Sequence, residues 1–393
     1  MAHRELDGKL LLAAELCDRG YIVKIGSKAN ILNYLSISTG GIFLSIWSAH
    51  KKFASVYSRI KKSKIKILAM DEESIVTMGD SIYTDTRLSD QSLKEIDLYL
   101  AFSDRDKSLV DRSKSAPTTV ATVGNPRLDV LQFMHDTVSP HLQKNVLFVS
   151  PFGFGNHYLG FNNYMKQLIE SGVIPECYIK HYYDYGCNQK SNMDKFYELV
   201  DLCVREGPKN VSYIYRPHPA ENISAVLDSL GHLNIAISQD TSLINDLLNS
   251  RLVVHNFCTV GVEAKILGIP TLGYSPITYN ILDEEFVYKD SAFASTPSEA
   301  LSHITRMTSL SFLDEFTSLK SNHINVNQPS YMKIANCIES LSPCYHSLTI
   351  SPALISFLKK RCSQLLLNIR KNYHSHRVKL LTVKNIIRRY KFF

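Results

Sequence analysis

The stretch "IYRPHPAENIS" (214–224) places a histidine between two prolines at the end of an apolar run. Each proline fixes its own φ and biases the preceding residue toward extended backbone, so Arg216 and His218 are held on a stiff loop. A guanidinium and an imidazole aimed in this way can stabilise the charge of a phosphate group. The alternative is an ordinary proline-rich strand exit that carries a surface histidine.

Three consecutive carboxylates follow another apolar run, in "DEES" (71–74). Like charges this close repel one another, which can raise the pKa of one of them toward a value suited to a general acid or base. Asp71, Glu72 and Glu73 are therefore candidate catalytic residues. The alternative is that these acids lie at the N-terminus of a helix, interact with its dipole and have no catalytic role.

A third apolar run leads into "GFGNHY" (153–158). Its glycines allow a backbone to approach a ligand closely, and Asn156 and His157 offer neutral donors and acceptors. The segment is not a GxGxxG fingerprint and lacks the lysine of a P-loop, so it does not favour a dinucleotide or ATP site.

A second candidate phosphate site lies in "CTVGVEAKILGIP" (258–270). We expect Thr259 to cap a helix that starts with "VGVEA", whose first N–H groups, near Gly261, can bind phosphate. Glu263, one turn further, could accept hydrogen bonds from ribose hydroxyls. Helix capping alone would also account for Thr259 and Glu263.

Apolar runs of strand length alternate with amphipathic helical stretches, which is typical of parallel α/β architecture. The predicted strands are 21–26, 41–46, 64–70, 97–102, 118–124, 145–152, 212–219, 234–239, 252–257 and 270–275. The predicted helices include 6–20, 48–63, 160–171, 193–206, 221–231, 241–249 and 260–267. Two such series predict two Rossmann-like domains facing a cleft, with ligands beyond the carboxyl ends of the strands.

The join between the domains is expected in the polar stretch 134–144. We predict an N-terminal domain over 1–138 with the catalytic carboxylates and the acceptor site. A C-terminal domain over 139–345 is predicted to bind a nucleotide-activated donor. Residues 346–393 are predicted to form a basic helical tail.

The tail holds the positive charge of the chain. Residues 351–393 contain eleven Lys or Arg and no acid, which leaves 33 basic against 37 acidic residues elsewhere. A basic amphipathic helix is typical of contact with an anionic membrane surface, whereas a helix packed back on the domains is the alternative. No other part of the chain resembles a nucleic-acid module, so no nucleic-acid partner is predicted.

Composition is that of a cytoplasmic protein, at 45% hydrophobic and 21% charged residues. No apolar run reaches the length of a transmembrane helix, and the charged first residues predict no secretory signal. Eight cysteines lie without metal-site spacing, so reduced thiols are expected and no metal or cofactor is predicted. A DxD-like pair is also missing where a metal-dependent transferase would need one.

The sequence resembles a family of bacterial surface carbohydrate biosynthesis proteins from capsule and lipopolysaccharide gene clusters. The resemblance rests on "RELDGKLLLAAELCDRGYIVKIG", "DEES", "VGNPRLDVL", "NVLFVSPFGFGNHY", "YRPHPAE" and "TVGVEAKILGIPTLGY". It implies a GT-B fold, similar to sialyltransferases and Kdo transferases that use CMP-activated 2-keto sugar acids. Relatives carry Gly where this chain has Ser74, a Ser or Thr pair where it has Cys258 and Thr259, and a strand ahead of "RELD".

The resemblance assigns phosphate binding to His218 with Pro219 and to Thr259. It assigns the catalytic role to an acidic residue among Asp71, Glu72 and Glu73. It implies a glycosyltransferase that moves a sugar from a CMP donor to a surface polysaccharide or lipid-linked glycan, and the missing DxD-like pair predicts that this enzyme is metal-independent. The basic tail, together with a lipid-linked acceptor, predicts peripheral contact at the inner leaflet of the plasma membrane. The alternatives are a CDP-alditol phosphotransferase of the teichoic-acid type, a nucleotide-sugar epimerase and a non-catalytic module of a glycan assembly complex.

Overall fold

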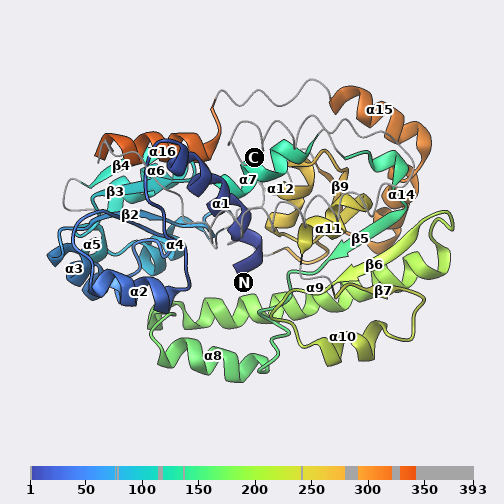
Figure 1. Ribbon diagram of the computed structural model, residues 1–393. Coiled ribbons are helices and arrows are strands. Elements are labelled where there is room, and N and C mark those ends of the chain that lie inside the picture. Colours follow the sequence, from blue (N-terminus) through green and yellow to red (C-terminus); the bar gives the residue numbers. More distant parts are fainter. Residues whose placement is uncertain are drawn as a thin grey trace. The chain divides into compact units, whose positions relative to one another are not determined.

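The computed structural model describes residues 2–75, 77, 79–113, 118–135, 138–239, 242–278, 291–320 and 328–341. These residues form two compact units (Figure 1). The N-terminal unit holds residues 2–75, 80–133 and the described residues after 325, and the C-terminal unit holds residues 76–79 and 134–325. The predicted tail, 346–393, lies outside the described residues, and the predicted three-part division of the chain stays a prediction.

The N-terminal unit is built on a parallel sheet of order β1-β2-β3-β4. Its strands are β1 (Ile42–Ser45), β2 (Lys66–Met70), β3 (Leu98–Ala101) and β4 (Thr119–Thr122). Because side chains alternate along a strand, Ile67 and Tyr99 point to one core and Leu68 and Leu100 to another. Both faces of the sheet are therefore buried, as a parallel sheet requires.

Helices cover each face of this sheet. The first core includes residues of α2 (Lys28–Ser36), η1 (Lys51–Phe53), α3 (Ala54–Lys62), α4 (Asp80–Arg87), α5 (Asp90–Leu93) and α6 (Asp104–Ser113). The second core includes α1 (Ala2–Asp18) and α16 (Ser330–Leu341), which lie side by side in Figure 1. Arg19 joins these two helices, because its guanidinium donates to Asn336 (2.7 Å) and Glu339 (2.8 Å).

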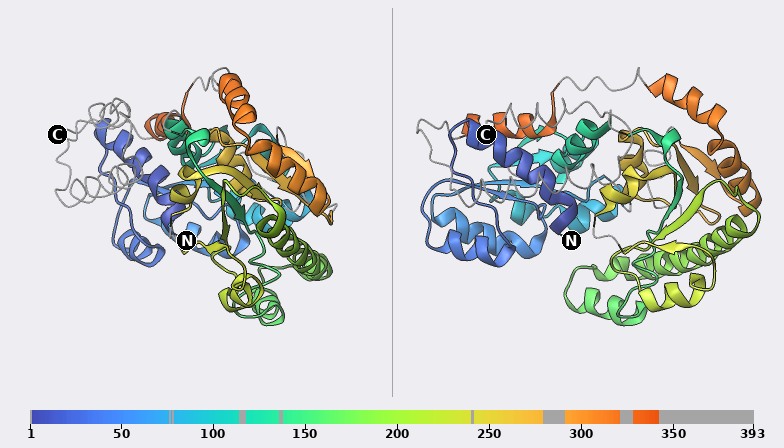
Figure 2. Two further views of the ribbon diagram at one scale, coloured as in Figure 1. Left: turned by 90° about the vertical axis from the view of Figure 1, so that its right-hand side faces the viewer. Right: turned by 45° about the vertical axis from the view of Figure 1, so that its right-hand side comes forward.

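The C-terminal unit is built on a parallel sheet of order β10-β9-β8-β5-β6-β7. Its strands are β5 (Asn145–Val149), β6 (Ser212–Arg216), β7 (Ala236–Ile237), β8 (Ser250–His255), β9 (Thr271–Tyr274) and β10 (Ala292–Ala294). One core packs these strands against α9 (Ile179–Glu206), α10 (Ile223–Leu230) and α14 (Pro297–Met307). The helices α11 (Leu243–Leu248) and α12 (Thr259–Ile266) contact β8, and Figure 2 shows α9 running beside the strands.

The structure describes five further helices. They are α7 (Pro126–Met134), η3 (Pro140–Leu142), α8 (Phe161–Glu170), η4 (Glu176–Tyr178) and α15 (Leu310–Lys320). The prediction of an α/β chain with two Rossmann-like units is confirmed, and nine of the ten predicted strands overlap an observed strand.

The predicted strand at 21–26 is wrong, because this segment pairs with no described strand. Its apolar alternation has another cause: Tyr21 and Val23 pack on the core that contains α1 and α16, whereas Ile22 and Ile25 are exposed. Among the described residues, no helix is long and apolar enough to cross a membrane.

Candidate functional site

The topology of the C-terminal unit makes one edge of its sheet a candidate ligand site. The chain runs from β5 outward to β6 and β7, and then returns to β8 on the opposite side of β5. In open α/β sheets, ligands bind at such a switch point, beyond the carboxyl ends of the strands. The predicted segments 153–158 and 258–270 follow β5 and β8, and 214–224 starts in the last residues of β6 and continues beyond it, so the fold brings all three to this edge.

His218 packs directly on the loop that follows β5. A Cβ at Gly153 would overlap the His218 imidazole, so glycine is required for this close approach. The backbone N–H of Ala220 donates to His218 Nδ1 (3.1 Å), which places the proton of the neutral ring on Nε2. The side chain is exposed, so Nε2–H can donate to an anionic ligand at the end of β6.

Arg216 has a different environment from His218. Its guanidinium pairs with Asp246, and the same Asp246 carboxylate accepts from Ser238 Oγ (2.6 Å). Only about an eighth of either charged side chain is exposed. The ion pair accounts for Arg216 without a ligand, and its contact with phosphate stays a prediction.

The start of α12 differs in one detail from the prediction. Thr259 is the first helical residue and Cys258 occupies the N-cap position, so the prediction of Thr259 as the cap is wrong. Phe257, just before, has a φ of 36°, a left-handed conformation that costs a non-glycine residue of order 1 kcal/mol or more. Strained backbone of this kind is common where a loop must present groups to a ligand.

Gly261 and Glu263 lie inside the first turns of α12. A Cβ at Gly261 would overlap the imidazole of His255, the last residue of β8, so the glycine allows α12 to pack on that strand. His255 is completely buried, and burial lowers its pKa to about 3, so the ring is neutral. Glu263 is also buried, at 2% exposed, which does not favour the predicted contact with a ribose.

Asn156 and His157, the two predicted donors after β5, play different parts. His157 is buried with its ring stacked on that of Tyr164 (3.7 Å between centroids, 3° between planes), and burial lowers its pKa. Its Nδ1 accepts from the backbone N–H of Leu159 (3.1 Å), so it supports the loop. Among the described residues, Asn156 Nδ2 is a buried donor with no hydrogen-bond partner, and it could donate to a ligand.

The structure adds a set of amides on α9 that the sequence analysis missed. Gln189 Oε1 accepts from the backbone N–H groups of Phe154 (3.2 Å) and Gly155 (3.0 Å), which fixes the loop after β5. Asn192 bonds both backbone groups of Ile277 after β9, accepting at 3.2 Å and donating at 2.8 Å. The sequence "NQKSN" could have indicated this set, because Gln189 and Asn192 are three residues apart and so lie on the same face of a helix.

Glu221 is a second missed residue, and it lies beside His218. Its carboxylate accepts from Ser150 Oγ and from the backbone N–H of His218 (3.3 Å), so it connects the loops after β5 and β6. The side chain is buried, and burial raises its pKa to about 7, with the hydrogen bonds from Ser150, His218 and Phe152 acting in the opposite direction.

This pKa predicts a pH dependence of stability. Folded Glu221 keeps its proton to about pH 7, whereas the unfolded residue loses it near its ordinary value of 4.5. The folded state therefore binds more protons in this window, and the free energy of unfolding should fall as pH rises from about 4.5 to 7. Urea titrations across this range measure the free energy of unfolding. Its decline with pH should be flatter in Glu221→Gln and unchanged in the control Glu170→Gln, which alters an exposed residue. A decline in Glu221→Gln as steep as in the wild type would contradict the assignment.

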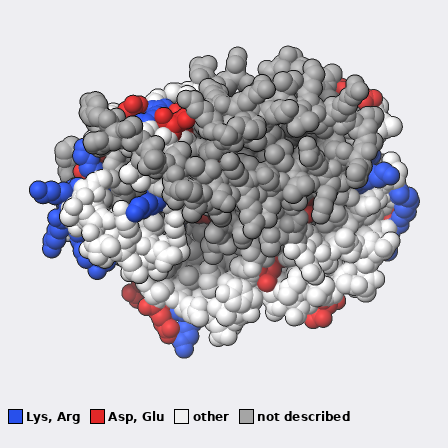
Figure 3. Space-filling view, in the orientation of Figure 1, with Lys and Arg blue, Asp and Glu red and all other residues white. Residues whose placement is uncertain are grey.

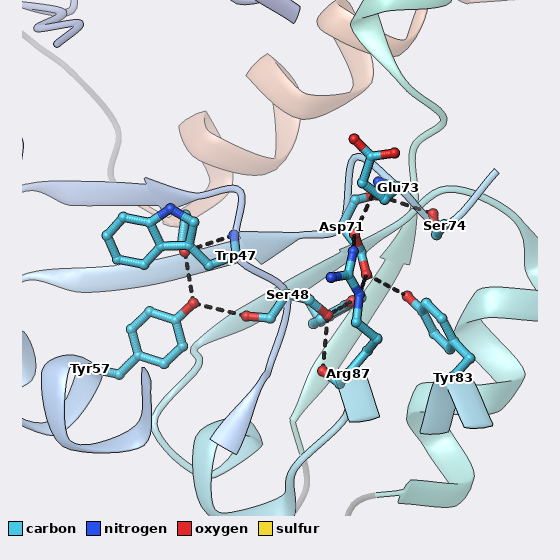
Figure 4. Close-up of polar contacts among 10 residues, drawn as sticks. Trp47, Ser48, Tyr57, Asp71, Glu73, Ser74, Tyr83 and Arg87 are labelled. Carbon is cyan, nitrogen blue, oxygen red and sulfur yellow. Dashed lines mark hydrogen bonds and ion pairs between the residues drawn. The ribbon is translucent and has the colours of Figure 1, made fainter. Parts of the chain in front are cut away.

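The three carboxylates of the N-terminal unit point in different directions. Asp71, 5% exposed, accepts two hydrogen bonds from Arg87 (2.9 and 2.7 Å) and one from Tyr83 (3.1 Å), as Figure 4 shows. Asp71 Oδ1 also accepts from the backbone N–H of Glu73 (3.0 Å). Asp71 therefore fixes the turn after β2, and Glu73 is exposed with its carboxylate directed away from Arg87.

Glu72 lines a small cavity on another side of the turn. Lys9 Nζ donates to Glu72 Oε2 (3.0 Å), and Arg127 lies 3.6 Å from Glu5, which lines the same cavity. Burial raises the pKa of Glu72, and the charge of Lys9 opposes that shift. The cavity, about 20 Å³, has room for a water molecule and not for a sugar.

No protein-family model and no curated protein matches the chain. Among solved structures, it resembles a putative UDP-N-acetylglucosamine 2-epimerase from Listeria monocytogenes, with a TM-score of 0.51 at 12% identity over 88% of this chain and 96% of the other. The S. aureus MnaA–UDP co-structure follows with 0.49 at 11% identity over 87% and 96%. A further UDP-N-acetylglucosamine 2-epimerase gives 0.49 at 13% identity over 84% and 82%. At these identities the likeness concerns the fold, and the chain has a two-domain GT-B-like fold.

Proposed function

We propose that the chain is a glycosyltransferase that moves a sugar from a nucleotide donor to a surface polysaccharide or a lipid-linked glycan. The observation that carries this proposal is the position of His218, held by Gly153 and Ala220 at the switch point of the C-terminal sheet. The leaving group of such a donor is a phosphate, on which negative charge develops in the transition state. A preorganised donor at that point stabilises the transition state without a metal.

The start of α12 and the Asn156 amide supply further donors at the same edge. The first N–H groups of a helix attract phosphate. The helix α12 begins shortly after β8, and β8 is the neighbour of β5 in the sheet. Asn156 follows β5 and keeps a buried Nδ2 without a partner in the described part of the chain. We propose that these three elements contact one phosphate group. A CMP-linked 2-keto sugar acid as the donor rests on the family resemblance of "YRPHPAE" and "TVGVEAKILGIPTLGY".

For the acceptor, we propose Glu73 as the general base. A base must come within hydrogen-bond reach of the hydroxyl that it deprotonates, and only then does its pKa matter. Glu73 is exposed on a turn fixed by Asp71, whereas Glu72 is held by Lys9 beside a cavity too small for a sugar. Asp71 then acts as a positioning residue. Contact of residues 346–393 with an anionic membrane, close to a lipid-linked acceptor, belongs to the same proposal.

Nucleotide binding gives the first test. A ligand that binds the folded state stabilises it by an amount that grows with the logarithm of its concentration over Kd, and so raises the melting temperature. We expect CMP to stabilise the protein in a thermal-shift panel of CMP, CDP, UMP and UDP. A shift with UDP and none with CMP would favour the second candidate, a nucleotide-sugar epimerase. The Listeria protein with a similar fold has that name. No shift with any nucleotide would overturn the proposal.

The donor can then be separated from the phosphotransferase alternative. A CMP-activated sugar acid and CDP-glycerol both release CMP when they are used, so CMP release from each donor is followed with the same assay. We expect release from the CMP-sugar acid. Release from CDP-glycerol alone would assign the chain to phosphotransfer.

A further inference from the structure

A cluster of aromatic and basic side chains lies at the carboxyl end of β1 in the N-terminal unit. Its centre is Trp47, the single tryptophan of the chain, which follows β1 and forms a bridge with Asp71. The indole stacks on Phe53 (4.7 Å between centroids, 25° between planes) and contacts Phe43 at a tilt (5.6 Å). Figure 4 shows Trp47 beside the Asp71 network, at the edge of the sheet where ligands bind in this class of fold.

Two lysines approach this aromatic pair from different elements. Lys28, the first residue of α2, has its Nζ 4.9 Å from the Trp47 ring and 4.7 Å from the Phe53 ring. Lys52, in η1, has its Nζ 5.2 Å from the Phe53 ring. A cation over an aromatic ring contributes about 0.5–1 kcal/mol at an exposed site. Lys28 and Lys52 each make such a contact, so two ammonium groups approach the same Phe53 ring.

The positive charges of this cluster affect one another. Burial lowers the pKa of Lys52, and the charges of Lys28 and Arg87 lower it further. The pKa of His50 falls to about 4 through burial and then through Lys52 and Arg87, while Asp71 opposes the shift. Asp71 already accepts two hydrogen bonds from Arg87. Lys28 and Lys52 therefore add positive charge that this carboxylate does not neutralise.

His50 offers a further donor within the cluster. Its Nδ1 accepts from the backbone N–H of Lys52 (3.1 Å), so the neutral ring carries its proton on Nε2. Within the described ranges, this buried Nε2 has no hydrogen-bond partner. A buried donor without a partner costs about 1–3 kcal/mol, which an incoming acceptor oxygen would recover.

We propose that Lys28, Lys52 and His50 form a binding site for a phosphate monoester or diester, with the Trp47 ring as its apolar wall. An anion would offset the repulsion between the lysines, and its oxygens are acceptors for both ammonium groups and for His50 Nε2. The ring is suited to the carbon atoms of the group that carries the phosphate. This site lies wholly in the N-terminal unit and does not depend on nucleotide binding by the C-terminal unit.

The fluorescence of Trp47 reports on this site alone, because the chain has no other tryptophan. The full chain is titrated with inorganic phosphate and with glycerol 3-phosphate, and with sodium chloride at equal ionic strength to measure screening. We expect a saturable change in emission with the phosphates and none with chloride. A change that matches chloride, or no change with any probe, would overturn the site.

Charge-removing variants locate the effect. We expect Lys28→Met and Lys52→Met each to weaken phosphate binding at least tenfold. Lys62→Met is the matched control, because Lys62 is an exposed lysine at the end of α3. Figure 3 shows Lys and Arg side chains along the outer margin of the N-terminal unit. Unchanged affinity in both Lys28→Met and Lys52→Met would also reject the proposal.

Vesicles separate the two sources of such a phosphate group. Phosphatidylglycerol vesicles are compared with soluble glycerol 3-phosphate in the same assay. An emission change with vesicles that requires Lys28 and Lys52 assigns the site to a lipid headgroup. A change with the soluble ester alone assigns it to a soluble phosphorylated ligand, and both results support the site.

Discussion

Replacing His218 with alanine is expected to lower kcat by about 10²- to 10³-fold, the usual effect of removing one preorganised donor from a transition state. The side chain is exposed, so the substitution buries no new polar group and loses only the contact with the loop at Gly153 and the hydrogen bond from Ala220. The melting temperature should therefore change little. The measurement is turnover of the nucleotide donor, with circular dichroism to verify the fold.

A second variant separates the imidazole donor from the shape of the loop. His218 Nδ1 accepts from the N–H of the residue two positions on, which is the bond that an asparagine side chain makes in an Asx turn. His218→Asn should keep this turn and lose Nε2, so its kcat should be as low as that of His218→Ala. Exposed His232→Ala, in the same unit, is the control. Wild-type turnover in His218→Asn would show that the distal nitrogen has no role in transfer.

The strands and loops at the candidate site were largely predictable from the sequence. Buried parallel strands are continuous apolar runs, so β5, β6 and β8 were visible, and the polar segments that follow them had to lie at one edge of the sheet. The strand predicted at 21–26 failed for a physical reason. Alternating burial of Tyr21 and Val23 describes an extended segment, whether or not another strand pairs with it.

Side-chain direction and long-range partners were not predictable. Asp71, Glu72 and Glu73 are adjacent in sequence, yet they lie with Arg87, with Lys9 and in solvent, respectively. The ion pair of Arg216 with Asp246 joins the end of β6 to α11, across 30 residues of chain. Gln189 and Asn192 lie outside the predicted helix 193–206, because α9 extends from Ile179 to Glu206, and only the folded loops give these amides their backbone partners.

Glu73→Gln is expected to lower kcat by about 10²- to 10⁴-fold with little change in the affinity for nucleotide, because a general base acts on the chemical step. The substitution keeps the size of the side chain, and the backbone N–H of residue 73 can still donate its hydrogen bond to Asp71. The turn after β2 should therefore remain in place. Glu72→Gln is the matched variant from the adjacent position. It removes the carboxylate that Lys9 contacts and should reduce stability more than turnover.

Asp71→Asn completes the comparison, because it tests position and not proton transfer. Removing one charge of a buried pair typically destabilises a protein by about 3–5 kcal/mol. The Arg87 side chain is 37% exposed here, so we expect a value at or below the lower end of that range. Turnover of the folded fraction should fall less than in Glu73→Gln. If Glu73→Gln retains wild-type turnover and Glu72→Gln loses it, the base is the residue beside Lys9, and a sugar hydroxyl must reach the cavity that Glu72 lines. If both retain it, the base lies outside this turn, and the carboxylates after β2 serve the fold of the N-terminal unit alone.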